Sequence, residues 1–140
     1  MIRRLVARLR RRRRIRVPCD SGVLELTVID DAAGLRRGLS GRRALRPGTG
    51  LLLVLPPRGE GDGGAIATVG IRFAIDVVFI DDRGRVLEVV ERLPPELSPA
   101  HDVPCAAEAA VDLRAGEARL AGLVEGCRLP ALAHVGGGDR

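Results

Sequence analysis

Short apolar segments separated by glycine, proline and aspartate recur along this chain, and their spacing constrains the fold more than any other feature. Residues 23–29 alternate apolar and polar side chains, as a strand with one buried face does. Residues 51–55 are apolar throughout, as in a strand buried on both faces. About seven or eight such segments with close turn signals favour a β sandwich or barrel over repeated βαβ units.

The same signals predict the other elements. Asp30 or Asp31 is the expected N-cap of a short helix ending at Arg37, and Gly84 allows a hairpin loop over residues 81–85. The four prolines of residues 94–104 predict a segment without regular structure. Further strands are expected within residues 66–80 (two segments), 86–90, 107–113 and 127–132, and a second short helix over 116–123.

A chain of 140 residues fits one domain, because it buries roughly two-thirds of its unfolded surface. Its only aromatic residues, Phe73 and Phe79, are expected in the core. Because the chain has no Tyr or Trp, recognition of nucleic acid bases by stacking on the domain is disfavoured.

Charge is distributed unevenly along the chain. Nine of the 23 basic residues, all arginine, fall within the first sixteen positions, where no acidic residue lies. The other fourteen face eighteen acidic residues, so the chain from Val17 onward has a net charge of −4, although the whole chain is +5. We therefore divide the chain into a basic arm (residues 1–16), one β domain (17–132) and a disordered tail (133–140).

Three interpretations of the arm stay open. A block of like charges is often a disordered tail. An apolar stripe at helical spacing instead favours a short amphipathic helix on anionic lipid. As a polycation, residues 3–16 could bind nucleic acid without sequence preference. The stripe consists of Ile2, Leu5, Val6 and Leu9, and the polyanion-binding candidates are Arg10, Arg11, Arg12, Arg13 and Arg14.

The arm does not have the pattern of a signal peptide, because no apolar stretch of the required length follows it. No segment approaches the roughly 18 apolar residues that span a bilayer. We therefore expect a cytoplasmic protein without a transmembrane segment, with peripheral membrane attachment through the arm as an alternative.

Several segments between about residues 23 and 129 match the pattern of a known family, and the most specific of them is Arg72-Phe73 followed by Ile75-Asp-Val-Val-Phe79. With these segments the chain resembles the domain of unknown function 192 family, a group of uncharacterised bacterial and archaeal proteins. The resemblance implies a compact, jelly-roll-like β domain and no established biochemical activity. The other matching segments are Gly38-Leu-Ser-Gly-Arg42, Gly48-Thr-Gly-Leu-Leu-Leu-Val-Leu-Pro56 and Gly84-Arg-Val86.

The chain departs from the family pattern just before Arg72. Family members often have a His-Thr-Phe-Gly-Met run there, and only Thr68 and Gly70 match it. The Arg72 and Asp76 positions of the family pattern are also kept. The candidate ligand-binding residues are Arg72, Asp76 and Thr68. One alternative is structural, with Asp76 ordering backbone amides and Arg72 paired with another carboxylate. The other is functional, with Arg72 receiving a carboxylate or phosphate ligand.

No catalytic residue, metal site or cofactor is predicted. His101, Cys105 and Cys127 lack a fourth ligand for a structural zinc site, and no serine lies in a nucleophile motif. We expect a non-enzymatic binding or assembly module. The alternative is an enzyme or small-anion-binding protein with a pocket near Arg72 and Asp76.

Overall fold

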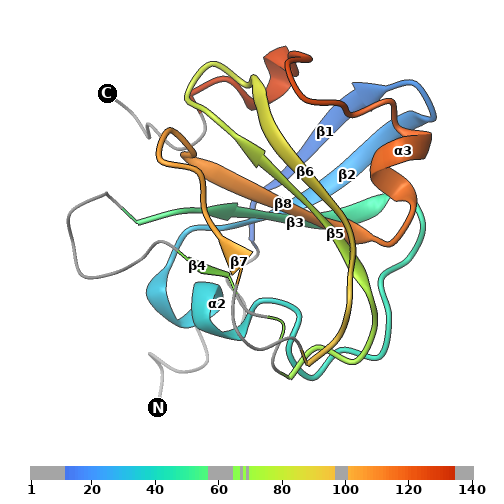
Figure 1. The fold of residues 1–140 in the computed structure, drawn as a ribbon, viewed down its shortest axis with the longest axis vertical. Helices are drawn as coiled ribbons and strands as arrows, with labels where there is room; N and C mark the ends of the chain where they lie inside the picture. Colours follow the sequence, from blue (N-terminus) through green and yellow to red (C-terminus); the bar gives the residue numbers. More distant parts are fainter. Residues whose placement is uncertain (1–11, 57–64, 67, 69, 97–100, 135–140) are drawn as a thin grey trace.

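Six strands of the computed structural model form one mixed sheet with the order β1-β2-β3-β8-β5-β6 (Figure 1). A second, two-stranded sheet pairs β4 with β7. The structure describes residues 12–56, 65–66, 68, 70–96 and 101–134. The elements are β1 (Arg14–Cys19), β2 (Gly22–Ile29), α2 (Ala32–Arg37), β3 (Thr49–Val54), β4 (Ala65–Ile66), β5 (Ile75–Ile80), β6 (Val86–Leu93), β7 (His101–Asp102), β8 (Ala109–Arg114), α3 (Glu117–Leu120) and the 3-10 helix η1 (Pro130–Leu132).

The mainly β class with short helices is confirmed. Neighbouring strands of the large sheet are antiparallel except β2 and β3, which are parallel. Jelly rolls are built from antiparallel strands, so this pair is one difference from the jelly-roll arrangement that the family resemblance implies. The sandwich or barrel description stays a prediction, because these six strands belong to one sheet.

The parallel pair has a consequence for the chain between its strands. Parallel neighbours need a crossover connection, so residues 30–48 leave the end of β2 and return to the start of β3. The crossover begins with α2, whose N-cap is Asp31, one of the two predicted residues. Its carboxylate accepts a hydrogen bond from the amide of Gly34 at 2.7 Å.

Each face of the large sheet carries its own hydrophobic cluster. One face packs against α3 and η1, and its cluster includes Leu26, Leu52 and Val111. The other face packs against the crossover and the segments around β7. Because neighbours in register share a face, alternate residues of β3, β8 and β5 supply the two clusters. The second cluster includes Leu39, Leu45, Leu51, Val77, Phe79, Val103 and Ala110.

The hairpin predicted over residues 81–85 is confirmed. It joins the antiparallel strands β5 and β6, and Gly84 has a φ of +80°. The amide nitrogen of Gly84 donates to the carbonyl of Asp81 at 3.2 Å. A residue with a side chain rarely adopts this backbone conformation, so glycine is required there.

Four sequence predictions are corrected. Residues 127–132 are not a strand: Arg128 makes one isolated bridge with Arg85, and the chain then forms η1, which begins at Pro130 because proline cannot extend a ladder. Phe73 is only half-buried, whereas Phe79 is fully buried. Residues 101–102 form β7 despite the surrounding prolines.

The fourth correction concerns the arm. Arg14 and Arg16 belong to β1, whose pairing with β2 begins at Arg14 opposite Thr27. The ladder thus starts three residues before the predicted domain boundary, because the arginine side chains point away from the apolar face. The apolar stripe of the arm and residues 135–140 of the tail lie outside the described residues.

Candidate anion-binding cavity

The second face of the sheet becomes polar toward β1. Arg14 of β1 lies opposite Thr27 of β2, and Thr27 lies opposite Leu51 of β3. Two residues before Thr27 on β2, Glu25 lies opposite Thr49. Because partners in register share a face, these five side chains form a mixed floor beside the apolar cluster.

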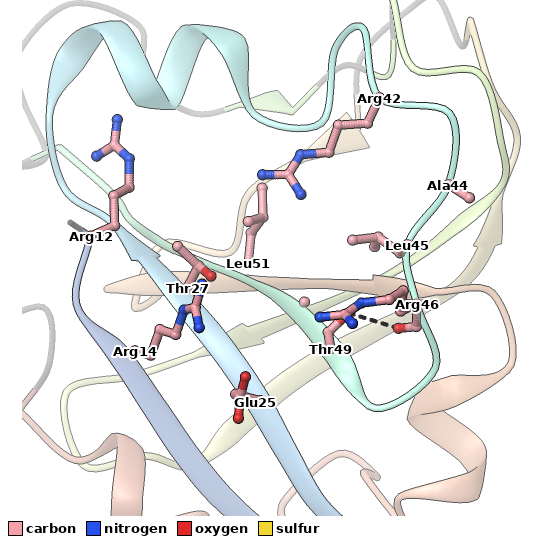
Figure 2. A pocket seen from close by; sticks show the side chains of 11 residues that line it. Arg12, Arg14, Glu25, Thr27, Arg42, Ala44, Leu45, Arg46, Thr49 and Leu51 are labelled. Atoms are coloured by element: carbon pink, nitrogen blue, oxygen red, sulfur yellow. Dashed lines mark hydrogen bonds between the residues drawn. The ribbon is translucent and has the colours of Figure 1, made fainter. Parts of the chain in front are cut away.

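The crossover lies beside this floor, and between them is an open cavity of about 760 Å³ (Figure 2). Its walls combine the polar edge of the sheet with the part of the crossover that follows α2. A volume of this size matches a small-molecule site. The lining residues are Arg12, Arg14, Glu25, Thr27, Arg42, Ala44, Leu45, Arg46, Thr49, Gly50 and Leu51.

Three arginines converge on the cavity from opposite sides. Figure 2 shows the guanidinium groups of Arg42 and Arg46, from the crossover, and of Arg14, from β1, turned toward its middle. Among the described residues, none of these three guanidinium groups has an ion-pair or hydrogen-bond partner. The cavity therefore presents three guanidinium groups that no described residue pairs with.

Arg12 also lines the cavity, but unlike Arg14, Arg42 and Arg46 it forms an ion pair. Both of its terminal nitrogens lie 3.4 Å from the carboxylate of Asp31, and its head points toward α2. The Gly34 amide, followed by the Arg12 guanidinium, holds the pKa of Asp31 below its ordinary value. The ion pair thus joins the start of β1 to the start of α2 at the edge of the cavity.

A buried carboxylate fixes the end of the crossover. Glu117, at the first position of α3, accepts a hydrogen bond from the amide of Gly48 at 2.9 Å and is only 6% exposed. The Thr49 hydroxyl also donates to the carbonyl of Arg46 at 2.7 Å. These two bonds hold the Arg46 segment in place against the sheet.

A second acidic group lies in the core beside this floor. Asp112 of β8 is opposite Leu51 and is 3% exposed, and its Oδ1 atom is buried without a hydrogen-bond partner. Burial raises the pKa of Asp112 to about 7. No sequence prediction names Asp112, although an acid flanked by apolar residues within a strand is a signal that could have identified it.

Asp76, one of the predicted site residues, is fully buried on the opposite face of the sheet. Its Oδ1 atom accepts from the amide of Arg92 at 2.9 Å, and its Oδ2 atom accepts from the amides of Gly116 at 2.9 Å and Ala118 at 3.0 Å. Backbone donors thus occupy both oxygens of the carboxylate.

Thr68 and Arg72 differ from each other in exposure. Thr68 is fully buried, and its hydroxyl donates to the carbonyl of Pro94 at 2.7 Å. Arg72 is exposed and, among the described residues, has no hydrogen bond or ion pair. Together with Asp76, these residues do not line the basic cavity. The structure therefore does not bring the three predicted residues together at this cavity.

A smaller cavity of about 410 Å³ lies beside the backbone partners of Asp76. Arg92 and Gly116 line it, and so do Arg119 and Glu91, which form an exposed ion pair with two nitrogen-to-oxygen distances of 3.2 Å. Because a carboxylate already pairs with Arg119, only Arg92 and Arg114 offer this cavity a guanidinium group without a hydrogen-bond or ion-pair partner among the described residues, against three in the larger cavity.

The predicted arm residues contribute to the larger cavity only in part. Arg12 and Arg14 line it, while Arg10 and Arg11 lie outside the described residues. Within the described ranges, no group of three His, Cys, Asp or Glu side chains could hold a metal ion. Over the same ranges, no helix has the length and apolar character needed to cross a membrane.

Fold and cavity together define a small, mainly β domain with an arginine-lined cavity on one face. The chain belongs to the DUF192 family, described as uncharacterized ACR, whose model matches residues 15–131. No curated protein matches this sequence.

Two solved structures share the fold. One is a "putative transcription regulator" from Sinorhizobium meliloti 1021, which is 22% identical with a TM-score of 0.71, over 86% of this chain and 95% of that one. The other is a protein of unknown function from Novosphingobium aromaticivorans DSM 12444, which is 16% identical with a TM-score of 0.68, over 83% of this chain and 82% of that one.

Proposed function

We propose that this protein is a non-enzymatic binding module whose basic cavity takes an anionic ligand, with a phosphate group as the preferred chemistry. The observation behind the proposal is the convergence of Arg14, Arg42 and Arg46 without a partner for any of their guanidinium groups among the described residues. Guanidinium groups bind phosphate oxygens in a bidentate fork, and several of them can enclose one phosphate.

The geometry favours a site over a merely solvated surface. Arg42 and Arg46 belong to the crossover, whereas Arg14 belongs to β1, so the fold has to bring two distant segments together to create the cavity. Like charges held close together repel each other, and a bound anion relieves that repulsion. The ligand is therefore expected to stabilise the folded chain.

The test is a titration of the full chain with inorganic phosphate, monitored by calorimetry and by the thermal midpoint. Arg42→Gln and Arg46→Gln should each weaken binding about tenfold, and the double variant should abolish it. Arg36→Gln is the matched control, because Arg36 is an exposed arginine of α2 that does not line the cavity.

Arg72→Gln is a second informative variant, since Arg72 is exposed without a partner in the described part of the chain. If Arg72→Gln removes phosphate binding while Arg42→Gln and Arg46→Gln do not, the anion site is the one that the sequence predicts near Arg72. That result would overturn the assignment to the basic cavity.

A second candidate function is non-specific binding of a nucleic acid backbone through the arm. It is favoured because Arg12 and Arg14, which belong to the arginine run that begins at Arg10, also line the cavity. The similar fold of a protein called a "putative transcription regulator" is compatible with it.

The arm is tested in the full chain with the double variant Arg10→Gln, Arg11→Gln, titrated onto a DNA duplex and onto anionic vesicles at two salt concentrations. Salt-sensitive DNA binding that the double variant weakens supports the second candidate. Binding to vesicles alone would instead favour attachment to an anionic membrane surface. Negligible binding of the wild-type protein to both the DNA duplex and the vesicles would exclude a role of the arm in nucleic acid binding and in membrane attachment.

A further inference from the structure

The floor of the basic cavity contains one group that a site for a simple anion does not need. Glu25 is half-buried there, among the four arginines that line the cavity. Among the described residues, its carboxylate forms no hydrogen bond or ion pair, even though guanidinium groups line the same space. Arg16 of β1 lies opposite Glu25 in the ladder, yet no ion pair joins the two side chains. A free carboxylate repels phosphate, so Glu25 suits a part of the ligand that donates hydrogen bonds.

A hydroxyl group lies next to this carboxylate. Thr27 follows Glu25 by two residues on the same strand, so both side chains project from the same face about 7 Å apart. Within the described part of the chain, the Thr27 hydroxyl has no hydrogen-bond partner, whereas the Thr49 hydroxyl already donates to Arg46. The floor therefore offers a carboxylate that accepts hydrogen bonds and a hydroxyl that both donates and accepts them.

Glu25 lies away from the arginines of the crossover but on the same side of the cavity as Arg14. Figure 2 shows Arg42 and Arg46 extending from the crossover, while Arg14 lies beside Thr27 and Glu25 on the neighbouring strands β1 and β2. A ligand that fits has an anionic end for the guanidinium groups and a hydrogen-bond-donating end for Glu25. The volume of about 760 Å³ leaves room for such a second end beyond a single phosphate.

We infer that the ligand is a phosphorylated polyol, of the chemical class of a sugar phosphate. Its phosphate is bound by Arg14, Arg42 and Arg46, and its hydroxyl groups donate to the Glu25 carboxylate. Phosphate is preferred over a single carboxylate because its double negative charge neutralises more of the charge of the cavity. This inference rests on the proposed function and specifies the ligand of the same cavity.

The carboxylate also argues against a bare polyanion as the preferred occupant. A phosphodiester chain places successive negative charges along its length, and one of them would approach Glu25 once another is seated on the arginines. Hydroxyl groups in the same position gain hydrogen bonds to an ionised acceptor, which are stronger than bonds between neutral groups.

The test compares ribose 5-phosphate with inorganic phosphate by calorimetry on the full chain. We expect the wild-type protein to bind ribose 5-phosphate at least about tenfold more tightly than inorganic phosphate. In Glu25→Gln this preference should fall below about threefold, because affinity for the sugar phosphate drops while affinity for inorganic phosphate rises. Glu125→Gln is the matched control, since Glu125 is exposed and does not line the cavity.

The outcomes separate this inference from the proposed function. Equal affinity for both probes in the wild-type and Glu25→Gln proteins would overturn the inference and leave the anion site intact. Absence of binding to either probe would remove the proposed function as well. Circular dichroism and the thermal midpoint of Glu25→Gln show whether the variant is folded, and Thr27→Val supplies a second variant that should also reduce the preference for the sugar phosphate.

Discussion

The Oδ2 atom of Asp76 lies 3.0 Å from the amide nitrogen of Ala118, and this hydrogen bond joins the start of β5 to the start of α3. The same carboxylate also accepts from the amides of Gly116 and Arg92. Arg92 has a φ of +53°, which is unusual for a residue with a side chain, and Asp76 holds its amide in place. One buried side chain thus orders the backbone of two separate segments.

Replacing Asp76 with asparagine is expected to destabilise the fold. An asparagine keeps one acceptor oxygen and brings an amide group that faces backbone N–H donors, so at least one buried donor loses its partner. We expect a loss of about 3 kcal/mol in the free energy of unfolding. Chemical denaturation measures it, with Asp82→Asn as the exposed control. Equal denaturation midpoints for the two variants would contradict the role given to Asp76.

Asp112 should make stability depend on pH. Its pKa is raised by burial from 3.8 to about 7, so between these values the folded chain keeps a proton that the unfolded chain has lost. Stability is therefore expected to fall as pH rises from about 4 to 7, by up to roughly 1 kcal/mol per pH unit, and to level off above 7. Asp112→Asn, which is neutral throughout, should flatten this dependence when denaturation is measured from pH 5 to pH 8. Asp82→Asn should leave it unchanged, and an unaltered slope in Asp112→Asn would show that another group causes it.

Gly84 should tolerate no side chain. A Cβ atom built there would collide with the carbonyl of Leu129, and the φ of +80° is itself unfavourable for other residues. We expect Gly84→Ala to cost roughly 3 kcal/mol, of which backbone strain explains about 1–2 kcal/mol. Gly126→Ala is the matched control, because Gly126 also has a positive φ, of +91°, but nothing lies within 4 Å of the added atom. If both variants lose the same stability in thermal unfolding, the contact with Leu129 contributes nothing.

Glu117 links the cavity to the rest of the domain. Truncation to alanine leaves the amide of Gly48 without its acceptor and should cost about 1–3 kcal/mol of stability. Because Arg46 lies two residues before Gly48, the same change should also weaken phosphate binding by loosening one wall of the cavity. Glu125→Ala should change neither quantity. Unchanged phosphate affinity in Glu117→Ala would show that Arg46 is positioned by other contacts.

The residues predicted for the site and the residues that form the cavity differ for a physical reason. Arg72 and Asp76 stand close in sequence, yet β5 begins only at Ile75, and Asp76 then faces α3 on the opposite side of the sheet from the cavity. Arg14 and Arg42 are 28 positions apart, and no local pattern relates them. They meet because β2 and β3 pair in parallel, which sends the crossover over the polar end of one face.

The sequence alone determined the mainly β class, the strand of residues 23–29, the Asp31 cap and the hairpin at Gly84, because each depends on local periodicity or on the backbone preference of a single residue. It also separated a basic arm from an acidic domain, but it did not show that β1 begins inside the arm. Only the tertiary structure decided the parallel pairing, the burial of Asp76 and Asp112, and the assembly of Arg14, Arg42 and Arg46 around one cavity. These features depend on which strands become neighbours, and strand order is set by the packing of the whole chain rather than by any one segment.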